Sequence, residues 1–398
     1  MSDSTTRLWD KGQPLDERIL RYTAGEDHVL DARLVPYDVQ ASIAHARMLQ
    51  QQNLLSTADA DAIEHGLKAL ATSHAAGEWQ ISLHDEDVHT ALESRLTAAI
   101  GEAGKRIHLG RSRNDQVLVA LRLYLRDATN QLATAAATTV AALEDLARAQ
   151  GNIELPGYTH MQQGMPSSVA LWAGAYVTEI KDDIAGIQRT LKRINLSPLG
   201  SAAGYGTPNI PVDRQATADA LGFEKVHEPV TAVQLSRGKA EAGLIFELCL
   251  LMQDLGRLAS DLLLFYTQEF AFVTLPGNMT TGSSIMPQKR NPDVLELVRA
   301  ATATMQGSLV EVLGITSKLP SGYQRDLQRL KPPLFKAVDL AEDSALIMAS
   351  LLGGLKFVPE NIHLDPSVHA AGDANKLVVE EGISFRDAYQ RVGEAYKK

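Results

Sequence analysis

The stretch GKAEAGLIFELCLLMQDLGRLASDLLLFYTQ, residues 238–268, decides the fold class of this 398-residue chain. Its apolar residues recur at alternating spacings of four and three, which is the pattern of one face of an α-helix. The seam runs through Leu244, Leu248, Leu251, Leu255, Leu258, Leu262 and Phe265. A second seam beside it consists of Ile245, Met252, Ala259 and Leu263. A helix that is apolar on two adjacent faces is buried among several partners, so we expect this one inside a helical core.

Four further segments repeat the helical periodicity, and two of them are richer in alanine. They cover residues 117–148, 166–196, 291–316 and 332–354. All five segments run beyond about 20 residues, whereas a typical globular helix has ~11–12. Strand signals are scarce, so the sequence predicts an all-α protein with a central bundle of five long helices. The doubled apolar faces predict that this bundle also packs against copies of itself.

The sequence predicts three helical domains. Residues 1–105 form a smaller N-terminal helical domain, with candidate amphipathic helices at 38–50 and 58–72. Residues 106–354 form the central helix-bundle domain, and residues 355–398 form a short C-terminal helical domain. The chain is long enough for such domains to share a large core.

The composition is that of an ordinary soluble globular protein, with 45% hydrophobic and 22% charged residues. Aromatic residues make up only 5%, which favours closely packed helices over sandwiches or barrels. The formal net charge is −10 and no stripe rich in lysine or arginine is present, which argues against nucleic acid or an anionic membrane as a partner.

The cysteine content and the N-terminus predict where the protein works. Cys249 is the one cysteine, so it can close no internal disulfide, and we expect a small core residue in a reducing compartment. Residues 1–12 lack an apolar signal region, and no segment is apolar over the length needed to span a bilayer. We therefore expect a cytoplasmic protein.

Three polar stretches punctuated by glycine each precede a long helix. They are HLGRSRNDQ at 108–116, GYTHMQQGMPSS at 157–168 and GSSIMPQKRNPD at 282–293. A helix N-terminus offers unpaired N–H groups and the positive end of its dipole. Each stretch alone could be an ordinary solvated loop. Together, and without acidic enrichment, they predict a site for an anion.

The side chains in the first two stretches suit a carboxylate ligand. Arg111 and Arg113 can grip carboxylates in bidentate fashion. His160 can titrate near neutrality, although a lone histidine in a loop is usually structural. Neutral hydrogen-bond donors are supplied by Ser112, Asn114 and Thr159.

The third stretch combines a hydroxyl, a cation and an amide. Lys289 lies six residues after Ser283, which is too far for a phosphate-binding P-loop, and the glycine-rich cradle is missing. Asn291 stands before Pro292 at a natural helix entry. Glu296 falls in the first turn or two of the helix, where it could orient a histidine.

Two other stretches contain residues typical of a metal site or a dinucleotide site. HDEDVH at 84–89 clusters possible metal ligands, but no second cluster joins it. GSAAGYG at 200–206 is rich in glycine, but we expect no strand before it, which disfavours a dinucleotide site. The sequence therefore predicts neither a metal nor another cofactor.

At the three polar stretches the chain resembles the fumarase/aspartase superfamily. GSSIMPQKRNPD is close to the superfamily signature, and GRSRNDQV at 110–117 narrows the resemblance to the argininosuccinate lyase/δ-crystallin branch. Further agreement comes from GYTH, SPLGSAAG, AHARML at 44–49 and GYQRDLQRLKPPLF at 322–335. The resemblance runs from about Leu30 to Val392, which is most of the chain.

The resemblance implies an assembly and a reaction. It implies a homotetramer whose central domains join in a twenty-helix core, with active sites that combine the three stretches from three different chains. The implied reaction is the reversible cleavage of argininosuccinate to L-arginine and fumarate, the last step of arginine synthesis. Proton abstraction next to a carboxylate creates an aci-carboxylate that must be stabilised electrostatically.

The resemblance also implies roles for individual residues. Ser283 matches the general base, whose oxyanion Lys289 and a helix dipole could stabilise. His160 matches a histidine assigned to acid–base work, with Glu296 as its orienting partner. Substrate-binding positions carry over to Ser112, Arg113, Asn114, Thr159, Asn291, Tyr323, Gln328 and Lys331. Of these, Lys331 and Thr159 would hold a succinyl carboxylate, while Tyr323 and Gln328 would contact the amino-acid portion.

Two stretches depart from the family pattern and leave alternatives open. AGEDHVLD at 24–31 replaces a region that usually contains a serine, and AVQLSRGKAE at 232–241 replaces an Asp-Arg-Asp pattern. One alternative is a sister lyase that releases fumarate from another N-substituted aspartate, although GRSRND disfavours adenylosuccinate. Another is a catalytically silent, crystallin-like homologue, against which the intact catalytic positions argue.

Overall fold

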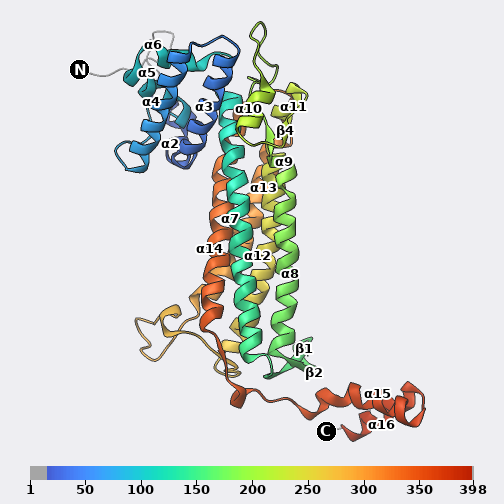
Figure 1. Ribbon diagram of the computed structural model, residues 1–398. Helices are drawn as coiled ribbons and strands as arrows, with labels where there is room; N and C mark the ends of the chain where they lie inside the picture. Colours follow the sequence, from blue (N-terminus) through green and yellow to red (C-terminus); the bar gives the residue numbers. More distant parts are fainter. Residues whose placement is uncertain (1–15, 397–398) are drawn as a thin grey trace. The chain divides into compact units, whose positions relative to one another are not determined.

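The computed structural model describes residues 16–396, which are mostly helical (Figure 1). The five longest helices in this range are α7 Arg113–Gln150, α8 Val169–Arg189, α12 Lys239–Tyr266, α13 Asp293–Thr316 and α14 Lys331–Gly354. They coincide with the five segments predicted from apolar periodicity. The prediction of a mostly helical protein built around long helices is confirmed.

The chain divides into two compact units, and each long helix contributes one end to each unit. The first unit contains Met1–Gln131, Ile187–Glu247 and Gln306–Asp339. The second contains Leu132–Gly186, Leu248–Met305 and Leu340–Lys398. The three-domain division predicted from the sequence stays a prediction.

In the first unit, short helices accompany the ends of the long ones. They are α1 Glu17–Ala24, α2 Asp27–Leu30, α3 Val35–Gln51, α4 Thr57–Ala75, α5 Val88–Ile100, α6 Glu102–Lys105, α9 Leu191–Ile194, α10 Arg214–Ala220 and α11 Val230–Leu235, with 3₁₀ helices η1 Asp31–Leu34, η2 Arg106–His108 and η4 Arg325–Leu330. The predicted helices at 38–50 and 58–72 are confirmed as α3 and α4. The side chain of Ser56 starts α4 by accepting a hydrogen bond from the amide of Asp59.

A two-residue strand corrects one expectation from the sequence. Strand β3, Leu196–Ser197, pairs in parallel with β4, Lys225–Val226. The glycine-rich stretch 200–206 therefore does follow a strand. No helix begins directly after it, because α10 starts only at Arg214. The stretch thus lacks the strand–turn–helix context of a dinucleotide site.

A buried ion cluster joins the start of α14 to α2 and η1 in the first unit. The Lys331 ammonium lies 2.6 Å from the Asp31 carboxylate and 3.0 Å from the Asp27 carboxylate. Burial opposes the charged form of Lys331, but the two carboxylates outweigh it and raise its pKa. Burial raises the pKa of Asp27 to about 6 in spite of the neighbouring ammonium.

In the second unit, the long helices are accompanied by short strands and two C-terminal helices. These elements are strands β1 Glu154–Thr159, β2 Gln162–Ser168, β5 Val273–Thr274 and β6 Lys356–Phe357, 3₁₀ helices η3 Gly277–Met279, η5 Pro359–Asn361 and η6 Pro366–His369, and helices α15 Ala370–Glu381 and α16 Phe385–Ala395. Strands β1 and β2 form an antiparallel hairpin with an irregularity between Gly157 and Tyr158. The stretch 157–168, expected to be a loop, is therefore mostly strand, and the helix predicted from 166 begins at Val169.

Side-chain contacts fix the helices of the second unit against one another. Thr139 on α7 donates to the carbonyl of Ala345 on α14 at 2.7 Å. Trp172 and Tyr176 on α8 both donate to the carboxylate of Asp261 on α12, at 3.0 and 2.7 Å. The five leucines of the α12 seam from Leu248 to Leu262 are fully buried between these helices. The double seam seen in the sequence is thus the packing surface of α12.

The structure also bears on the expectations about membrane-spanning segments and about Cys249. Within residues 16–396, no helix is both long enough and apolar enough to cross a membrane. Cys249, expected in the core, is partly buried. The expectation about the signal region at residues 1–12 lies outside the described residues.

Replacing Leu258 by alanine should destabilise the helical core. This side chain is fully buried on α12, and removing buried methyl groups leaves a cavity. We expect a loss of about 2–5 kcal/mol in the free energy of unfolding, measured by urea denaturation. Val379→Ala is the control, because Val379 on α15 is 83% exposed. Equal stability of the two variants would contradict a packed α12 seam.

Replacing Asp27 by asparagine should change how stability depends on pH. The pKa of Asp27 in the folded protein, about 6, lies above its ordinary value of 3.8. Proton binding therefore stabilises the fold below about pH 4, and this contribution is lost as the pH rises through about 6. A difference of about two pKa units corresponds to about 3 kcal/mol.

The measurement is urea unfolding of the wild type and Asp27→Asn at several pH values. The wild type should lose up to about 3 kcal/mol of unfolding free energy relative to the variant between about pH 4 and 7. Asp145→Asn, at an exposed position of α7, is the control. The difference in unfolding free energy between this variant and the wild type should not change with pH. If the difference between Asp27→Asn and the wild type were also independent of pH, burial would not raise the pKa of Asp27.

Candidate functional site

The first polar stretch forms the cap of helix α7. The Ser112 hydroxyl accepts a hydrogen bond from the amide of Asn114, and Asp115 accepts one from the amide of Ser112. This reciprocal arrangement satisfies two of the free N–H groups at the helix start. The other carboxylate oxygen of Asp115 accepts from the amides of Gly200 and Ala202, both at 2.8 Å. Asp115 thereby fixes the stretch 200–206 against the start of α7.

A cavity of about 340 Å³ lies in the first unit. Residues from α1, α2, α5, α7, α14 and the segment 323–328 line it. They are Thr23, Ala24, Asp27, Glu86, Asp87, His89, Arg113, Asn114, Val117, Arg237, Tyr323, Arg325, Gln328 and Lys331. Five of the predicted substrate-binding residues are among them, which are Arg113, Asn114, Tyr323, Gln328 and Lys331. The structure therefore brings together residues that the sequence separates by more than 200 positions.

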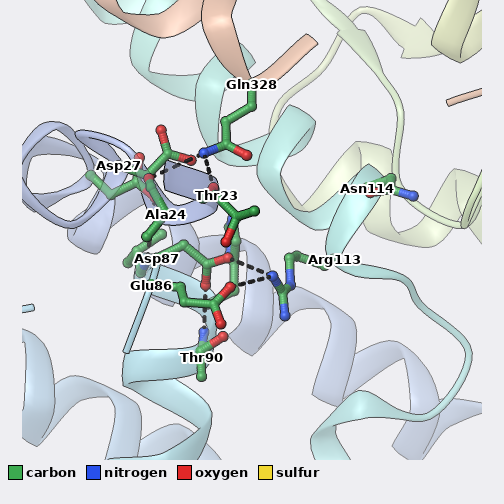
Figure 2. Close-up of polar contacts among 12 residues, drawn as sticks. Thr23, Ala24, Asp27, Glu86, Asp87, Thr90, Arg113, Asn114 and Gln328 are labelled. Carbon is green, nitrogen blue, oxygen red and sulfur yellow. Dashed lines mark hydrogen bonds and ion pairs between the residues drawn. The ribbon is translucent and has the colours of Figure 1, made fainter. Parts of the chain in front are cut away.

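Arg113 faces two carboxylates inside this cavity. Its guanidinium lies 3.3 Å from Asp87 and 3.6 Å from Glu86, as the dashed lines in Figure 2 show. Asp87 also caps α5 by accepting from the amide of Thr90 at 2.9 Å. Burial alone would raise the pKa of Asp87, but His89 and Arg113 outweigh it and lower that pKa. Asp87 is thus a fixed anion next to Arg113.

The stretch 84–89, which imitated a metal site in the sequence, supplies three lining residues of this cavity. They are Glu86, Asp87 and His89. Within residues 16–396, no group of three or more histidine, cysteine or acidic side chains is arranged to hold a metal ion. The sequence disfavoured a metal site here but did not predict the place of these residues in the cavity. An acidic pair beside a histidine was the signal that could have revealed it.

The segment after α13 is held against the N-terminal helices. Gln328 donates to the carbonyls of Thr23 and Ala24 at 2.8 and 3.1 Å (Figure 2). Arg325 donates to the carbonyl of Thr23 at 2.9 Å. The amide nitrogen of Gln328 is therefore occupied, and its carbonyl oxygen is the group free to meet a ligand. Tyr323 and Lys331, on either side of this segment in the sequence, also line the cavity.

Arg237 brings the second unusual stretch, 232–241, into the cavity. Its guanidinium lies 5.7 Å from the centre of the Tyr323 ring, within the range of a cation–π contact. Burial lowers the pKa of Arg237. Arg111, in contrast, does not line the cavity, because its guanidinium is buried and donates to Ser42 at 2.9 Å. Of the two arginines in the first stretch, Arg113 is the one that can meet a ligand here.

The second polar stretch presents its histidine on a tight turn in the second unit. His160 and Met161 connect β1 to β2, and both have left-handed backbone angles, with φ of 53° and 60°. Two consecutive positive values are typical of the type I′ hairpin turn, which residues other than glycine adopt at some cost. His160 and Thr159 are exposed at this end of the hairpin.

The third polar stretch forms a loop that is closed at its base. Thr281 and Asn291 pair through two backbone hydrogen bonds of 3.1 and 2.9 Å. Inside the loop, the Ser283 hydroxyl oxygen accepts from the amides of Ile285 and Met286, at 3.3 and 3.1 Å. The loop leads into α13 at Asp293, and Glu296 lies in the first turn of that helix, exposed.

Within the described part of one chain, the other catalytic residues predicted from the sequence are not joined to His160 by a hydrogen bond or an ion pair. Among residues 16–396, no hydrogen bond or ion pair links His160 to Ser283, Lys289 or Glu296. Thr159 and Asn291 also belong to the second unit, whereas the cavity lies in the first. Ser112 caps α7 next to the cavity without lining it. The roles of all these residues stay predictions.

The chain is similar to known proteins over nearly its whole length. A protein-family model described as Lyase matches residues 15–307. An argininosuccinate lyase of Sorangium cellulosum is 47% identical over 390 residues, which cover 98% of this chain and 90% of that protein. An argininosuccinate lyase of Thermotoga neapolitana is 40% identical over 392 residues, which cover 98% of this chain and 98% of that protein.

Solved structures agree with this relationship. A variant of EDDS lyase with bound fumarate superposes with a TM-score of 0.79 at 25% identity, covering 96% of this chain and 76% of that chain. The class II fumarase of Schistosoma mansoni superposes with a TM-score of 0.80 at 19% identity, covering 94% of this chain and 88% of that chain, and shows the shared fold. From the full-length sequence matches, the chain belongs to the argininosuccinate lyase family and has the fold of the fumarases.

Proposed function

We propose that the protein cleaves argininosuccinate reversibly to L-arginine and fumarate. The observation that carries this proposal is the match over 98% of the chain to argininosuccinate lyases at 47% and 40% identity. The predicted base, cation and histidine of the reaction, Ser283, Lys289 and His160, are all present. The cytoplasmic location expected from the composition stays a prediction.

The charges of the cavity support a substrate with both signs of charge. Asp27, Glu86 and Asp87 provide carboxylates, and Arg113, Arg325 and Lys331 provide cations. Argininosuccinate carries a guanidinium and an ammonium as well as carboxylates. We assign the amino-acid portion of the substrate to this cavity, where Asn114, Tyr323 and Gln328 supply neutral hydrogen-bonding groups.

Lys331 can serve the substrate while it remains in its ion cluster. An ammonium has three N–H donors, and Asp27 and Asp31 account for two of them. The third donor is proposed to hold a succinyl carboxylate together with Thr159. Because the cluster keeps Lys331 charged, this donor is available throughout the neutral pH range.

The geometry of the third polar loop supports Ser283 as the general base. A serine hydroxyl is a weak base unless its oxyanion is stabilised. Two backbone N–H groups already point at the Ser283 oxygen, and Lys289 adds a cation on the same loop. The loop is thus prepared for a negative charge before the reaction begins, which is how enzymes obtain electrostatic catalysis.

The remaining predicted residues complete the proposed chemistry. Lys289, Asn291 and loop N–H groups would stabilise the aci-carboxylate formed when the Cβ proton leaves. His160 would carry out acid–base work, with Glu296 as its orienting partner. Ser112 would contribute from the cap of α7. No cofactor enters this scheme.

We further propose a homotetramer with a twenty-helix core and active sites that combine residues from different chains. Exposed apolar side chains on α12 and α13 support such packing: Phe246, Leu297 and Val310 are 50%, 70% and 69% exposed. Large apolar groups on helices otherwise packed in a core mark an interaction surface. Shared sites would let the exposed His160 turn and the Ser283 loop meet the cavity of another chain.

A sister lyase is the second candidate function. The similarity to EDDS lyase with bound fumarate favours an activity on another N-substituted aspartate. The identity to that protein is 25%, against 47% to an argininosuccinate lyase, so argininosuccinate is preferred. Incubation with each candidate substrate, followed by fumarate absorbance, distinguishes them. Turnover of another succinyl amine without turnover of argininosuccinate would overturn the proposal.

Replacing Ser283 by alanine should reduce kcat by at least about 10²–10³-fold, because the proton acceptor at Cβ is lost. The rate is followed as fumarate absorbance with argininosuccinate as substrate. Ser284→Ala, one residue further along the same loop, is the matched control and should keep most of the activity. If Ser283→Ala retained a near-normal rate, the assignment of the base would be wrong.

Two inactive variants should complement each other when mixed. Arg113→Met affects the cavity in the first unit, and Ser283→Ala affects the loop in the second. If one site draws on different chains, reassembly from a denatured equimolar mixture creates some intact sites. Random mixing gives at most about one quarter of the wild-type activity. Separately refolded variants are the control, and a mixture as inactive as they are would contradict shared sites.

A further inference from the structure

A buried histidine in the cavity has no role in the chemistry assigned so far. His89 is the second residue of α5, lines the cavity of the first unit, and is 4% exposed. Its Nδ1 contacts the carboxylate of Asp38 on α3, which is fully buried. A carboxylate bound to one ring nitrogen fixes the orientation of the ring and favours its protonated form.

Further buried groups hold the Asp38 carboxylate in place. It accepts from the Gln116 amide at 3.1 Å and from the Ser42 hydroxyl at 2.9 Å. Ser42 in turn accepts from Arg111 at 2.9 Å. Two residues of the first polar stretch thus help to fix the Asp38 carboxylate that contacts His89. Gln116 bonds to it directly, and Arg111 does so through Ser42. Such support keeps a carboxylate–histidine pair rigid.

The second ring nitrogen of His89 is free to meet a ligand. Among residues 16–396, Nε2 has no hydrogen-bond partner, although it is shielded from solvent. The two nitrogens of an imidazole point toward different edges of the ring. Because Asp38 does not line the cavity and His89 does, Nε2 is the nitrogen on the cavity side. A buried polar atom without a partner is costly, and a bound substrate can relieve that cost.

Charged groups on four elements surround His89. Asp38 comes from α3, Asp31 from η1, and Asp87 from the start of α5. Lys331 of α14 neutralises part of the Asp31 charge. Burial opposes the charged imidazolium, but the three carboxylates outweigh burial and raise the pKa of His89. The charged form of the ring, which these carboxylates favour, holds on Nε2 a proton that can be donated.

We propose that His89 is the general acid that donates the Nε2 proton to the guanidino nitrogen leaving the succinyl carbon. This rests on the proposed function. Ser283 takes the Cβ proton, the electrons of that C–H bond form the C=C bond of fumarate, and the C–N bonding pair moves to nitrogen. His89 becomes neutral and arginine leaves with an intact guanidinium. Ser283 then releases the Cβ proton to solvent, and a proton from solvent restores the imidazolium.

The position of His89 fits the nitrogen side of the substrate. The leaving nitrogen belongs to the guanidino group. Asp87, whose charge acts on His89, and Glu86 line the same cavity, and a carboxylate can pair with a guanidinium. His160 lies instead on an exposed turn of the second unit. The proposed acid thus belongs to the cavity of the first unit, and the proposed base belongs to the Ser283 loop of the second unit.

Hydrogen exchange separates the two proton transfers experimentally. His89→Gln is incubated with argininosuccinate in D₂O, and NMR follows deuterium entry at Cβ while absorbance follows fumarate. The variant should release fumarate about 10²–10⁴-fold more slowly than wild type, as expected for a lost general acid, while exchange at Cβ continues. Adding Ser283→Ala to this variant should abolish the exchange. His65→Gln, at an exposed position of α4, is the matched control and should behave as wild type.

Each outcome decides the proposal. Near-normal fumarate release by His89→Gln would overturn it. So would a parallel loss of exchange and release in a folded variant, because His89 would then act in binding or structure. Failure of the wild type to release fumarate from argininosuccinate would instead overturn the proposed function.

Asp38→Asn provides an independent test through the pH profile of kcat. A general acid must be protonated, so activity falls as the pH rises through its pKa. Removing the Asp38 carboxylate lowers the pKa of His89, and the alkaline fall of kcat should move to lower pH. An unchanged profile in a folded, active variant would overturn the proposal. If Asp38→Asn does not fold, the exchange experiment on His89→Gln still decides.

Discussion

The first unit depends on charges that are buried together and compensate one another. A carboxylate or an ammonium removed from water without a partner costs several kcal/mol. Here Lys331 is balanced by Asp27 and Asp31, while Asp38 contacts the ring of His89 and raises its pKa. Each pair joins helices that are distant in sequence. The charges therefore order the walls of the cavity as well as its electrostatic field.

This compensation explains why the binding residues are rigid. Three of the proposed binding residues already contact another group of the protein before any ligand binds. They are Arg113, Gln328 and Lys331. A side chain already fixed by such contacts loses little conformational entropy when a substrate binds. The entropy of these side chains is lost during folding instead. Burial of the apolar seams of the long helices stabilises the fold and offsets this loss.

The second unit holds its functional groups differently. His160 sits on a two-residue turn with left-handed angles, and Ser283 sits in a loop closed by the Thr281–Asn291 pair. Backbone hydrogen bonds, rather than side-chain packing, fix both groups. In the proposed homotetramer, such turns would reach into the cavity of another chain.

The sequence predicted the elements whose stability comes from periodic burial. The five long helices follow from apolar spacing, because each must bury a stripe along its whole length. The β1–β2 hairpin escaped prediction, since its strands contain glycine, proline and polar residues and are specified by pairing with each other. The three polar stretches were found because they precede long helices. The place of the stretch 84–89 in the cavity was not predicted, because its partners, Asp38 and Arg113, are distant in sequence.

The stretch 24–31 shows how a departure from a family pattern can be resolved by structure. In the sequence, the stretch lacks a serine that members of the family usually have in this region. In the fold it supplies Asp27 and Asp31, which surround the ammonium of Lys331. One carboxylate would suffice to balance one ammonium, and burial raises the pKa of Asp27 to about 6. If Lys331 holds a succinyl carboxylate as proposed, protonation of Asp27 would keep the charge of the cluster balanced when that carboxylate arrives.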